Sequence, residues 1–360
     1  MRIALVLGTS SGGVGRHVHG LARELRSRGH GIVVACPPPV ESQFRFAETG
    51  AKWAPVAMTD RPRPDRDATA LARLRSVVRG ADVVHAHGLR AGSLACLAAT
   101  GSGTPVVVTL HNAPPAGRMT SRMYAVLERI VARRATAVLG VSSDLLARQR
   151  DLGARTSGLA VIPAPRGPGE VTDRHTVRSS LGLAEGTSMA VCVGRLAPQK
   201  GLDLLLDAVA RLRDLPLVVV VAGEGPERAH LAERIAAEDL PVRLLGHRSD
   251  ILDLLSAADV VVSSSVWEGQ PISLQEALQV GAAIVATDVG GTAAVLGDAG
   301  LLTAPGDDNA LAAAIRLVVT YGSERDRLRS HAFERAAALP DEAAAADAAL
   351  AVYERVLVRS

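Results

Sequence analysis

The chain has 360 residues, of which 48% are hydrophobic and 21% are charged, a composition typical of globular proteins and not of disordered ones. Despite a net charge of +3, the aromatic content of 2% argues against single-strand nucleic-acid binding, so we expect no nucleic-acid partner. Three cysteines without a CxxC pair argue against a disulfide framework and a zinc site. No apolar run approaches the ~18 residues that span a membrane, and the apolar start is too short for a signal peptide, which predicts a cytoplasmic protein.

Charge is unevenly distributed along the chain. Residues 1–165 contain 22 Lys and Arg against 10 Asp and Glu, whereas residues 166–360 contain 18 against 27. Chance variation in composition together with attraction between two domains is one interpretation, and a basic first half that meets an anionic surface or acceptor is the other. The arginines considered for such a surface are Arg61, Arg63, Arg66, Arg118, Arg122, Arg133 and Arg134.

The predicted elements of the first half alternate between short apolar strands and helices. A buried strand over 3–7 precedes a glycine turn and a helix over 17–30, which Gly29 ends. Residues 59–70 are rich in proline and arginine and predict a loop. Further strands are expected at 31–36, 82–87, 105–111 and 136–142.

The second half repeats this plan. The proline- and glycine-rich segment 161–173 predicts the domain boundary, and residues 341–360 predict a final helix. Repeated βα units in both halves predict an α/β fold with two doubly wound domains on parallel sheets. The strands of the second half are expected at 189–194, 217–223, 242–246, 259–265, 282–288 and 300–305.

The glycine-rich segment 8–18 lies between a strand and a helix, where a phosphate-binding loop would lie. It does not complete GxGxxG, because Val18 takes the place of the third glycine, and it is no Walker A loop, because Val14 replaces the required lysine. A nicotinamide enzyme and a P-loop ATPase are therefore disfavoured. The Gly12–Gly13 turn is either a place where backbone approaches an anion or a tight turn only.

Other candidate residues of the first half are acidic or histidine. Asp65 and Asp67 form a DxD triplet, but no strand precedes it, so we expect no bound metal. His85 and His87 alternate on one strand and are expected to point to opposite faces. His111 ends a strand, and it is either a core histidine or a group that orients a substrate hydroxyl.

In the second half, two carboxylates flank the start of a helix expected near Pro271–Ser273. Glu268 lies on the preceding loop and Glu276 lies in the first turns, with Ser273 and Glu276 at capping-box spacing. Both carboxylates belong at the carboxyl end of a strand, where open α/β sheets bind ligands, although surface carboxylates remain the alternative.

Two cations follow the strand at 189–194. Arg195 and Lys200 precede a helix, and Lys200 is one of only two lysines in a chain with 38 arginines. Both side chains suit phosphate oxygens, and solvated loop cations are the alternative.

These segments together resemble the retaining, nucleotide-sugar-dependent glycosyltransferases of group 1, or family four, which have the GT-B fold. The resemblance implies two facing Rossmann-like domains with an interdomain cleft. Residues 1–165 would form the acceptor side, with 345–360 packing back on it, and residues 166–344 the donor side. The matching segments are 8–30, 193–208, 222–226, the E-x7-E pair Glu268 and Glu276, 283–296 and 300–307.

The resemblance also implies roles for individual residues. Arg195 and Lys200 would hold the donor diphosphate and stabilise the leaving charge without a metal cofactor. Glu276 would bind ribose hydroxyls, and Glu268 and His111 would contact the transferred sugar. The other donor-binding residues would be Gly13 near the phosphates, His247 at the base, and Gln270, Pro271, Ile272 and Ser273 at the phosphate and sugar, although Pro271 has no N–H to donate.

The reaction implied is retaining transfer of a sugar from a nucleotide diphosphate sugar, with UDP as the family preference, to an acceptor hydroxyl. The acceptor would be a lipid-linked, cell-envelope or small-molecule glycoside, and contact of the basic half with the inner face of the membrane is a hypothesis. A nucleotide-sugar epimerase of the same fold and a non-catalytic nucleotide-sugar-binding module are the alternatives.

Overall fold

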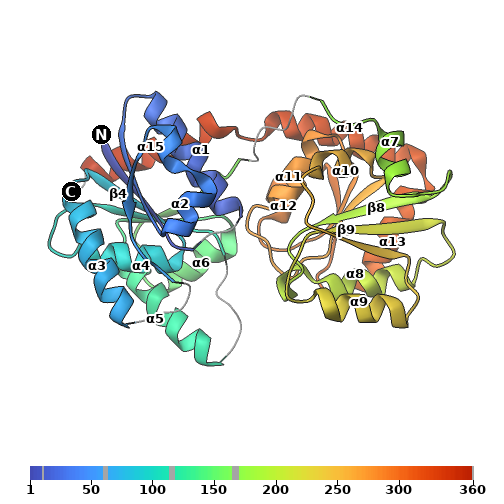
Figure 1. Ribbon diagram of the computed structural model, residues 1–360, viewed down its shortest axis with the longest axis horizontal. Helices are drawn as coiled ribbons and strands as arrows, with labels where there is room; N and C mark the ends of the chain where they lie inside the picture. Colours follow the sequence, from blue (N-terminus) through green and yellow to red (C-terminus); the bar gives the residue numbers. More distant parts are fainter. Residues whose placement is uncertain (10–11, 60–63, 113–117, 164–169, 359–360) are drawn as a thin grey trace. The chain divides into compact units, whose positions relative to one another are not determined.

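The computed structural model describes residues 1–9, 12–59, 64–112, 118–163 and 170–358. The chain divides into two compact units (Figure 1). Unit 1 is Met1–Pro163 together with Pro340–Ser360, and unit 2 is Ala164–Leu339. The sequence placed the domain boundary after residue 165 and the return at residue 345, and residues 164–169 of the expected boundary segment lie outside the described residues.

Unit 1 is built on a parallel sheet whose described strands run in the order β3-β2-β1-β4-β5-β6-β7. Its central strands are buried along nearly their whole length and are rich in valine and leucine, as expected where helices cover both faces of a parallel sheet. The strands are β1 Arg2–Leu7, β2 Gly31–Cys36, β3 Lys52–Pro55, β4 Val83–His87, β5 Val106–Leu110, β6 Ala137–Gly140 and β7 Ser157–Leu159.

The helices of unit 1 lie in two layers, with α1 beside α15 and with α3, α4 and α5 side by side (Figure 1). The segment 59–70 was expected to be a loop, which is wrong for its second part, because α3 begins at Pro64. Proline suits a first helical turn, where its missing N–H has no partner in any case. The helices are α1 Gly13–Ser27, α2 Pro38–Phe44, the 3-10 helix η1 Phe46–Thr49, α3 Pro64–Arg79, α4 Leu89–Ala98, α5 Arg118–Arg134, α6 Ser143–Asp151 and α15 Glu342–Val358.

The last helix of the chain belongs to unit 1. Helix α15 packs against α1, where Gly20 leaves room for the Glu342 side chain, since a Cβ at Gly20 would lie 2.5 Å from a Glu342 carboxylate oxygen. Arg23 of α1 pairs with Glu342 as well. Tyr353 of α15 is completely buried, so this helix is part of the unit 1 core and not an appendage.

Unit 2 has a parallel sheet whose described strands run in the order β10-β9-β8-β11-β12-β13. Alternate residues of β8 face two cores, one closed by α8 and α13 and the other by α10, α11 and α12. The strands are β8 Ser188–Val193, β9 Leu217–Ala222, β10 Val242–Gly246, β11 Val260–Ser263, β12 Ile284–Thr287 and β13 Gly300–Thr303. The helices are α7 Arg174–Ser180, the 3-10 helix η2 Pro198–Lys200, α8 Leu202–Ala210, α9 Arg228–Ala237, α10 Ile251–Ala257, α11 Ile272–Gln279, α12 Thr292–Leu296, α13 Asp308–Thr320 and α14 Gly322–Ala338.

Both sheets follow the doubly wound order in which the first strand lies beside the fourth, so the expected α/β class is confirmed for each unit. In such sheets, ligands bind outside the carboxyl ends of the strands where the strand order reverses. The reversal lies between β1 and β4 in unit 1 and between β8 and β11 in unit 2. These two places are where the functional residues should be sought.

Candidate functional site

At the strand-order reversal of unit 2, a lysine and a glutamate from different loops form an ion pair. Lys200 follows β8, Glu268 follows β11, and Lys200 Nζ lies 2.5 Å from Glu268 Oε1. The same carboxylate oxygen accepts a hydrogen bond of 2.6 Å from the Ser265 hydroxyl. The Glu268 side chain is 8% exposed and that of Lys200 is 23% exposed, so the pair is largely shielded from water but reachable on the lysine side.

Polar contacts hold the two loops of this ion pair against each other. The Gln199 amide donates to the Trp267 carbonyl at 2.9 Å, and the Ser264 hydroxyl donates to the Lys200 carbonyl at 3.0 Å. From the neighbouring strand, the Thr287 hydroxyl donates to the Ser265 carbonyl at 2.6 Å. The loops after β8, β11 and β12 therefore form one connected scaffold, which fixes the carboxylate of Glu268.

Two glycines with positive φ allow the close backbone approaches in this scaffold. Gly201 has φ +57°, and a Cβ there would lie 2.3 Å from the Ser264 carbonyl oxygen. Gly290 has φ +55°, and a Cβ there would lie 1.8 Å from the carbonyl oxygen of Glu268. Any larger residue at either position would displace the loop that carries the acid.

Helix α11 begins directly after this loop, with Pro271 as its N-cap residue in an extended conformation. The expected capping box of Ser273 and Glu276 is wrong, because Ser273 lies inside the first turn and no side chain caps the helix. The N–H groups of Ile272 and Ser273 belong to the first turn, where helical N–H groups have no intrahelical partner. Gln270 and Glu276 are partly buried at the same end of the sheet.

The remaining predicted donor residues of unit 2 follow other strands of the same sheet edge. Arg195 follows β8 and is exposed, and its guanidinium makes no hydrogen bond or ion pair with any residue that the structure describes. His247 follows β10 and is also exposed. Of the predicted residues of unit 2, Lys200 and Glu268 are in direct contact, and the others follow strands at the same edge of the sheet.

In unit 1, the strand-order reversal is occupied by buried histidines. His87 is the last residue of β4, and its Nδ1 lies 3.1 Å from Nε2 of His111, which follows β5. His17 of α1 lies close to both, with ring centroids 5.5 Å from His87 and 5.8 Å from His111. Gly13, the first residue of α1, is partly buried at the same end of the sheet.

The expectation that His85 and His87 point to opposite faces is wrong. Residues two apart on a strand share a face, and the rings of His85 and His87 lie 4.2 Å apart. His85 is bound at both nitrogens, by the Tyr353 hydroxyl at 2.6 Å and the Thr109 hydroxyl at 2.7 Å. His85 is therefore a satisfied core residue behind His87.

Burial keeps these imidazoles neutral. It lowers the pKa of His17 to about 4 and, with a contribution from His17, that of His85 to about 3. Burial and the neighbouring imidazoles also lower the pKa of His87 and His111 well below the ordinary value. At neutral pH, each of these four rings therefore has one N–H and one unprotonated nitrogen.

Metal-binding groups were not expected from the sequence. Asp67 of the DxD triplet pairs with Arg90, and the side chain of Asp65 lies outside the described residues. Within the described part of the chain, no three His, Cys, Asp or Glu side chains are placed to hold a metal ion.

Comparison with known proteins gives the family. A sequence model described as Glycosyl transferases group 1 matches residues 173–335, and one described as Glycosyl transferase 4-like domain matches residues 12–165. A phosphatidyl-myo-inositol mannosyltransferase of Mycolicibacterium smegmatis is 30% identical over 357 residues, which cover 93% of this chain and 88% of that protein. The chain belongs to the group 1 glycosyltransferases.

This glycosyltransferase is also similar to TuaC of Bacillus subtilis, named as a glycosyltransferase of teichuronic acid biosynthesis. The two are 33% identical over 244 residues, 65% of this chain but only 60% of TuaC. Among solved structures, Anabaena HepE in complex with UDP-glucose superimposes with a TM-score of 0.83 at 21% identity, over 99% of this chain and 100% of that one. That likeness confirms the GT-B class of fold.

Sequence reasoning did not single out Ser265 or Gly290, and it placed His87 on the wrong face of its strand. Ser265 holds Glu268, and Gly290 makes room for its backbone. His87 contacts His111, yet its place on the strand was misjudged. The period of two along β4, applied correctly, would have placed His85 and His87 on one face, whereas the contacts of Ser265 and Gly290 join separate loops and leave no signal in local sequence.

Proposed function

We propose that this glycosyltransferase transfers a sugar from a nucleotide diphosphate sugar, with UDP as the preferred nucleotide, to an acceptor hydroxyl with retention of configuration. The observation that supports this most is the Lys200–Glu268 pair at the strand-order reversal of unit 2. It joins a cation suited to phosphate to a carboxylate suited to sugar hydroxyls, at the sheet edge where such folds bind nucleotides. HepE, which shares the fold, has been solved with UDP-glucose.

In this proposal, Arg195 and Lys200 bind the diphosphate and stabilise the charge that develops on the leaving nucleotide, with no metal cofactor. Arg195 is exposed and free of described partners, so it can turn to a ligand without breaking an existing ion pair. Lys200 has three donor hydrogens, so it can keep Glu268 while it contacts an oxygen of phosphate.

The nucleoside and the sugar are assigned to the other residues of the same edge. Glu276 binds the ribose hydroxyls, Glu268 a hydroxyl of the transferred sugar, and His247 lies at the base. Gln270 and the N–H groups of Ile272 and Ser273 contact the phosphate and sugar. Pro271 has no N–H, so its place at the N-cap contributes shape and not a hydrogen bond.

The carboxylate of Glu268 is not assigned the part of a covalent nucleophile, since Lys200 and Ser265 both engage its Oε1. We propose instead that the acceptor hydroxyl attacks from the face that the nucleotide leaves. The departing phosphate oxygen takes the acceptor proton, so one C–O bond breaks and one forms on the same side of the sugar. In unit 1, His111 and Gly13 are the residues proposed to contact substrate.

The test is calorimetric titration of UDP, GDP and ADP into the purified protein in the presence of EDTA. We expect UDP to bind most tightly of the three. We also expect Glu276→Ala and Lys200→Met to weaken nucleotide binding at least 10-fold, because hydrogen bonds to charged groups contribute about 1.5–3 kcal/mol. Arg228→Met, which breaks an exposed pair with Glu224, is the matched control and should bind normally. Failure of all three nucleotides to bind to folded protein would overturn the proposal.

The donor sugars of the nucleotide that binds are then supplied with and without candidate glycoside acceptors. We expect a product only when an acceptor is present. The anomeric configuration of the transferred sugar, measured by NMR, should be the same in the product as in the donor. An altered sugar formed without acceptor would instead indicate an epimerase.

An anionic or membrane-surface acceptor is the second part of the proposal. Arg122, Arg129 and Arg133 are exposed on α5, together with Val126, which is 54% exposed. These positions recur at helical spacing and form one basic stripe. Arg61, Arg63 and the side chains of Arg66 and Arg118 lie outside the described residues, and no described helix is long and apolar enough to cross a membrane. We expect the protein to sediment with anionic liposomes at low salt and to lose this binding when the three arginines are replaced by glutamine. If the unchanged protein does not sediment with the liposomes, the membrane-surface acceptor is ruled out.

A further inference from the structure

The contact between His87 and His111 depends on which of the two rings carries the proton between them. Both rings are buried, His87 being 3% and His111 9% exposed, and Nδ1 of His87 lies 3.1 Å from Nε2 of His111. Two neutral imidazoles joined in this way share one N–H in the contact. The ring that supplies this N–H determines what the far nitrogen of each ring offers.

Two arrangements are possible. If His87 donates from Nδ1, His111 accepts at Nε2 and its own N–H is on Nδ1, which then faces outward as a donor. If His111 donates from Nε2, its Nδ1 is an unprotonated acceptor, and the N–H of His87 is on Nε2. Nδ1 of His111 makes no hydrogen bond with any described residue, so it is the atom available to substrate.

The surroundings of His87 distinguish the two arrangements. Nε2 of His87 is buried and has no hydrogen-bond partner among the residues described. A buried N–H without a partner is rarer and more costly than a buried acceptor without one. The first arrangement leaves only an unprotonated nitrogen at this position, so it is the favoured one.

The groups around His87 also fix its ring. His85 of the same strand lies against it at 4.2 Å and is anchored by Tyr353 of α15 and Thr109 of β5. His17 of α1 lies at its edge and His111 accepts from it. Burial lowers the pKa of all of these imidazoles, so a neutral pair is the resting state at neutral pH.

We propose that His87 is a positioning residue that holds His111 in the Nδ1–H tautomer, so that His111 donates a hydrogen bond from Nδ1 to an oxygen of the substrate. This inference rests on the proposed function, since it needs His111 to contact substrate. His87 itself touches no substrate and acts through the ring that it orients.

The chain offers a matched pair of variants. Asparagine and leucine have nearly the same shape, but the amide of asparagine lies where Nδ1 of histidine would be and can donate to His111. We expect His87→Leu to lower kcat about 10- to 100-fold, the effect seen when metal-bound histidines lose their outer hydrogen-bond partner. His87→Asn should recover most of that loss, and both variants should bind the nucleotide as the unchanged protein does.

Tyr353→Phe is the control for damage to the core. It removes a hydrogen bond from His85 without touching the contact of His87 with His111, so it should lower the stability of unit 1 but leave kcat within about 3-fold. If His87→Leu and His87→Asn are equally slow, or equally fast, His87 has no positioning role and the inference is overturned.

A second measurement does not depend on activity. Nitrogen-15 NMR of histidine-labelled protein reports which ring nitrogen holds the proton, with His111 assigned by comparison with His111→Gln. We expect the Nδ1–H form in the unchanged protein and in His87→Asn, and a shift toward the ordinary Nε2–H form in His87→Leu. An Nε2–H form in the unchanged protein would overturn the inference. Absence of nucleotide binding would overturn the proposed function alone, because the NMR result would still stand.

Discussion

At the scale of residues, the Lys200–Glu268 pair can act in two ways that can be tested separately: it stabilises the loops of unit 2, and its lysine is available to a ligand. Glu268 is nearly buried, so its negative charge needs both the lysine and the Ser265 hydroxyl. The pair is then part of the loop scaffold before any ligand arrives. A ligand that shares Lys200 must leave this contact intact or replace it with another cation, for which Arg195 is the nearest candidate in sequence.

We predict that Lys200→Met lowers the stability of unit 2 by about 1–3 kcal/mol, because it leaves a buried carboxylate without its cation. Lys200→Met combined with Glu268→Gln should recover part of this loss, since the charge is then gone as well. Urea unfolding, followed by the fluorescence of Trp267 in a Trp53→Phe background, measures both. A single variant as stable as the unchanged protein would show that solvent already screens the pair.

Residue types at this site could be predicted from the sequence, but their contacts could not. The lysine among arginines and the spacing of Glu268 and Glu276 identified the sheet edge correctly. The capping box failed because Pro271, with its fixed φ, forms the N-cap itself and places Ser273 inside the helix. Pairing of Lys200 with Glu268 depends on loops 68 residues apart, for which no local pattern exists.

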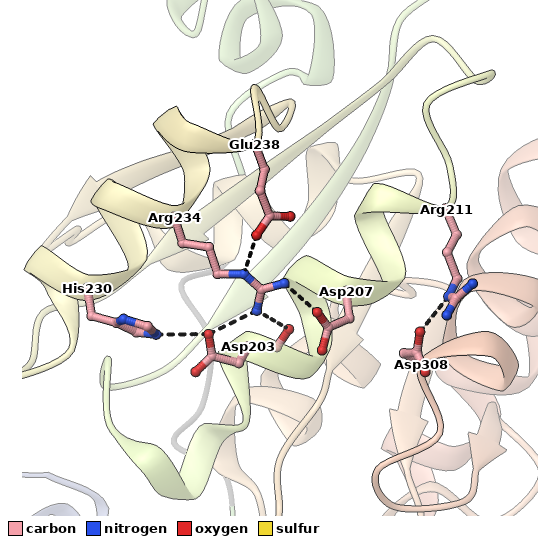
Figure 2. Close-up of polar contacts among 7 residues, drawn as sticks. All are labelled: Asp203, Asp207, Arg211, His230, Arg234, Glu238 and Asp308. Atoms are coloured by element: carbon pink, nitrogen blue, oxygen red, sulfur yellow. Dashed lines mark hydrogen bonds and ion pairs between the residues drawn. The ribbon is translucent and has the colours of Figure 1, made fainter.

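At the scale of elements, α8 and α9 are joined by an arginine with several carboxylate partners (Figure 2). Arg234 of α9 bonds to Asp203 and Asp207 of α8 and to Glu238 at its own C-terminal end. The hydrogen bonds that Arg234 donates to Glu238 and Asp207, against the opposing effect of burial, raise the pKa of Arg234. Nearby, Arg211 makes a single pair with Asp308 of α13, and this pair is exposed on the arginine side.

We predict that Arg234→Met destabilises unit 2 by about 1–2 kcal/mol, whereas Arg211→Met costs less than about 1 kcal/mol. Both changes keep the apolar stem of the side chain, so the comparison isolates the charge. The first change also leaves three carboxylates close together. Thermal or urea unfolding of both variants is the measurement, and the difference should shrink in 0.5 M salt. Equal losses would mean that the additional partners of Arg234 contribute nothing.

The elements themselves were predictable where apolar runs were long. All eleven strands expected from such runs are present, and each end lies within two residues of the expected one. Strands β3 and β7 were missed, because Lys52–Pro55 and Ser157–Leu159 are short, contain no buried residue and so lack an apolar signal. The start of helix α3 was missed because a segment rich in proline and arginine is typical of a loop. Pro64 is nevertheless well suited to the first turn of a helix.

At the scale of the whole molecule, the two units should respond differently to acid. The imidazoles of unit 1 have lowered pKa values, with His17 at about 4 and His85 at about 3, whereas unfolded histidines titrate near 6.5. Below pH 6.5 the unfolded state of unit 1 therefore binds protons that the folded state does not, and stability falls as the pH falls. In unit 2, burial alone would raise the pKa of Asp259, but the hydrogen bond from the Met189 N–H and the charge of Arg174 lower it. The contribution of ionised Asp259 to the stability of unit 2 is therefore lost only near and below pH 4.

We predict that unit 1 loses stability between pH 7.5 and 5, approaching about 1.4 kcal/mol per pH unit for each buried histidine well below pH 6.5, while unit 2 changes little. The chain has two tryptophans, Trp53 in unit 1 and Trp267 in unit 2, so Trp267→Phe and Trp53→Phe give one reporter each. In His87→Leu, the free energy of unfolding of unit 1 should depend less steeply on pH than in the unchanged protein. Equal pH slopes for both units would contradict the lowered pKa values of the cluster.

Unit 1 is interrupted in sequence by the whole of unit 2, and this order has a consequence during synthesis. Tyr353, which completes the unit 1 core against His85, lies 190 residues after Pro163. At about 5–20 residues per second, a ribosome delivers α15 about 10–40 s after the rest of unit 1. Throughout that time the nascent sheet has one face uncovered around His85, while unit 2, which is continuous, can complete itself. The half of the chain that is made first is thus the half that finishes folding last, and it is the one on which chaperones would act.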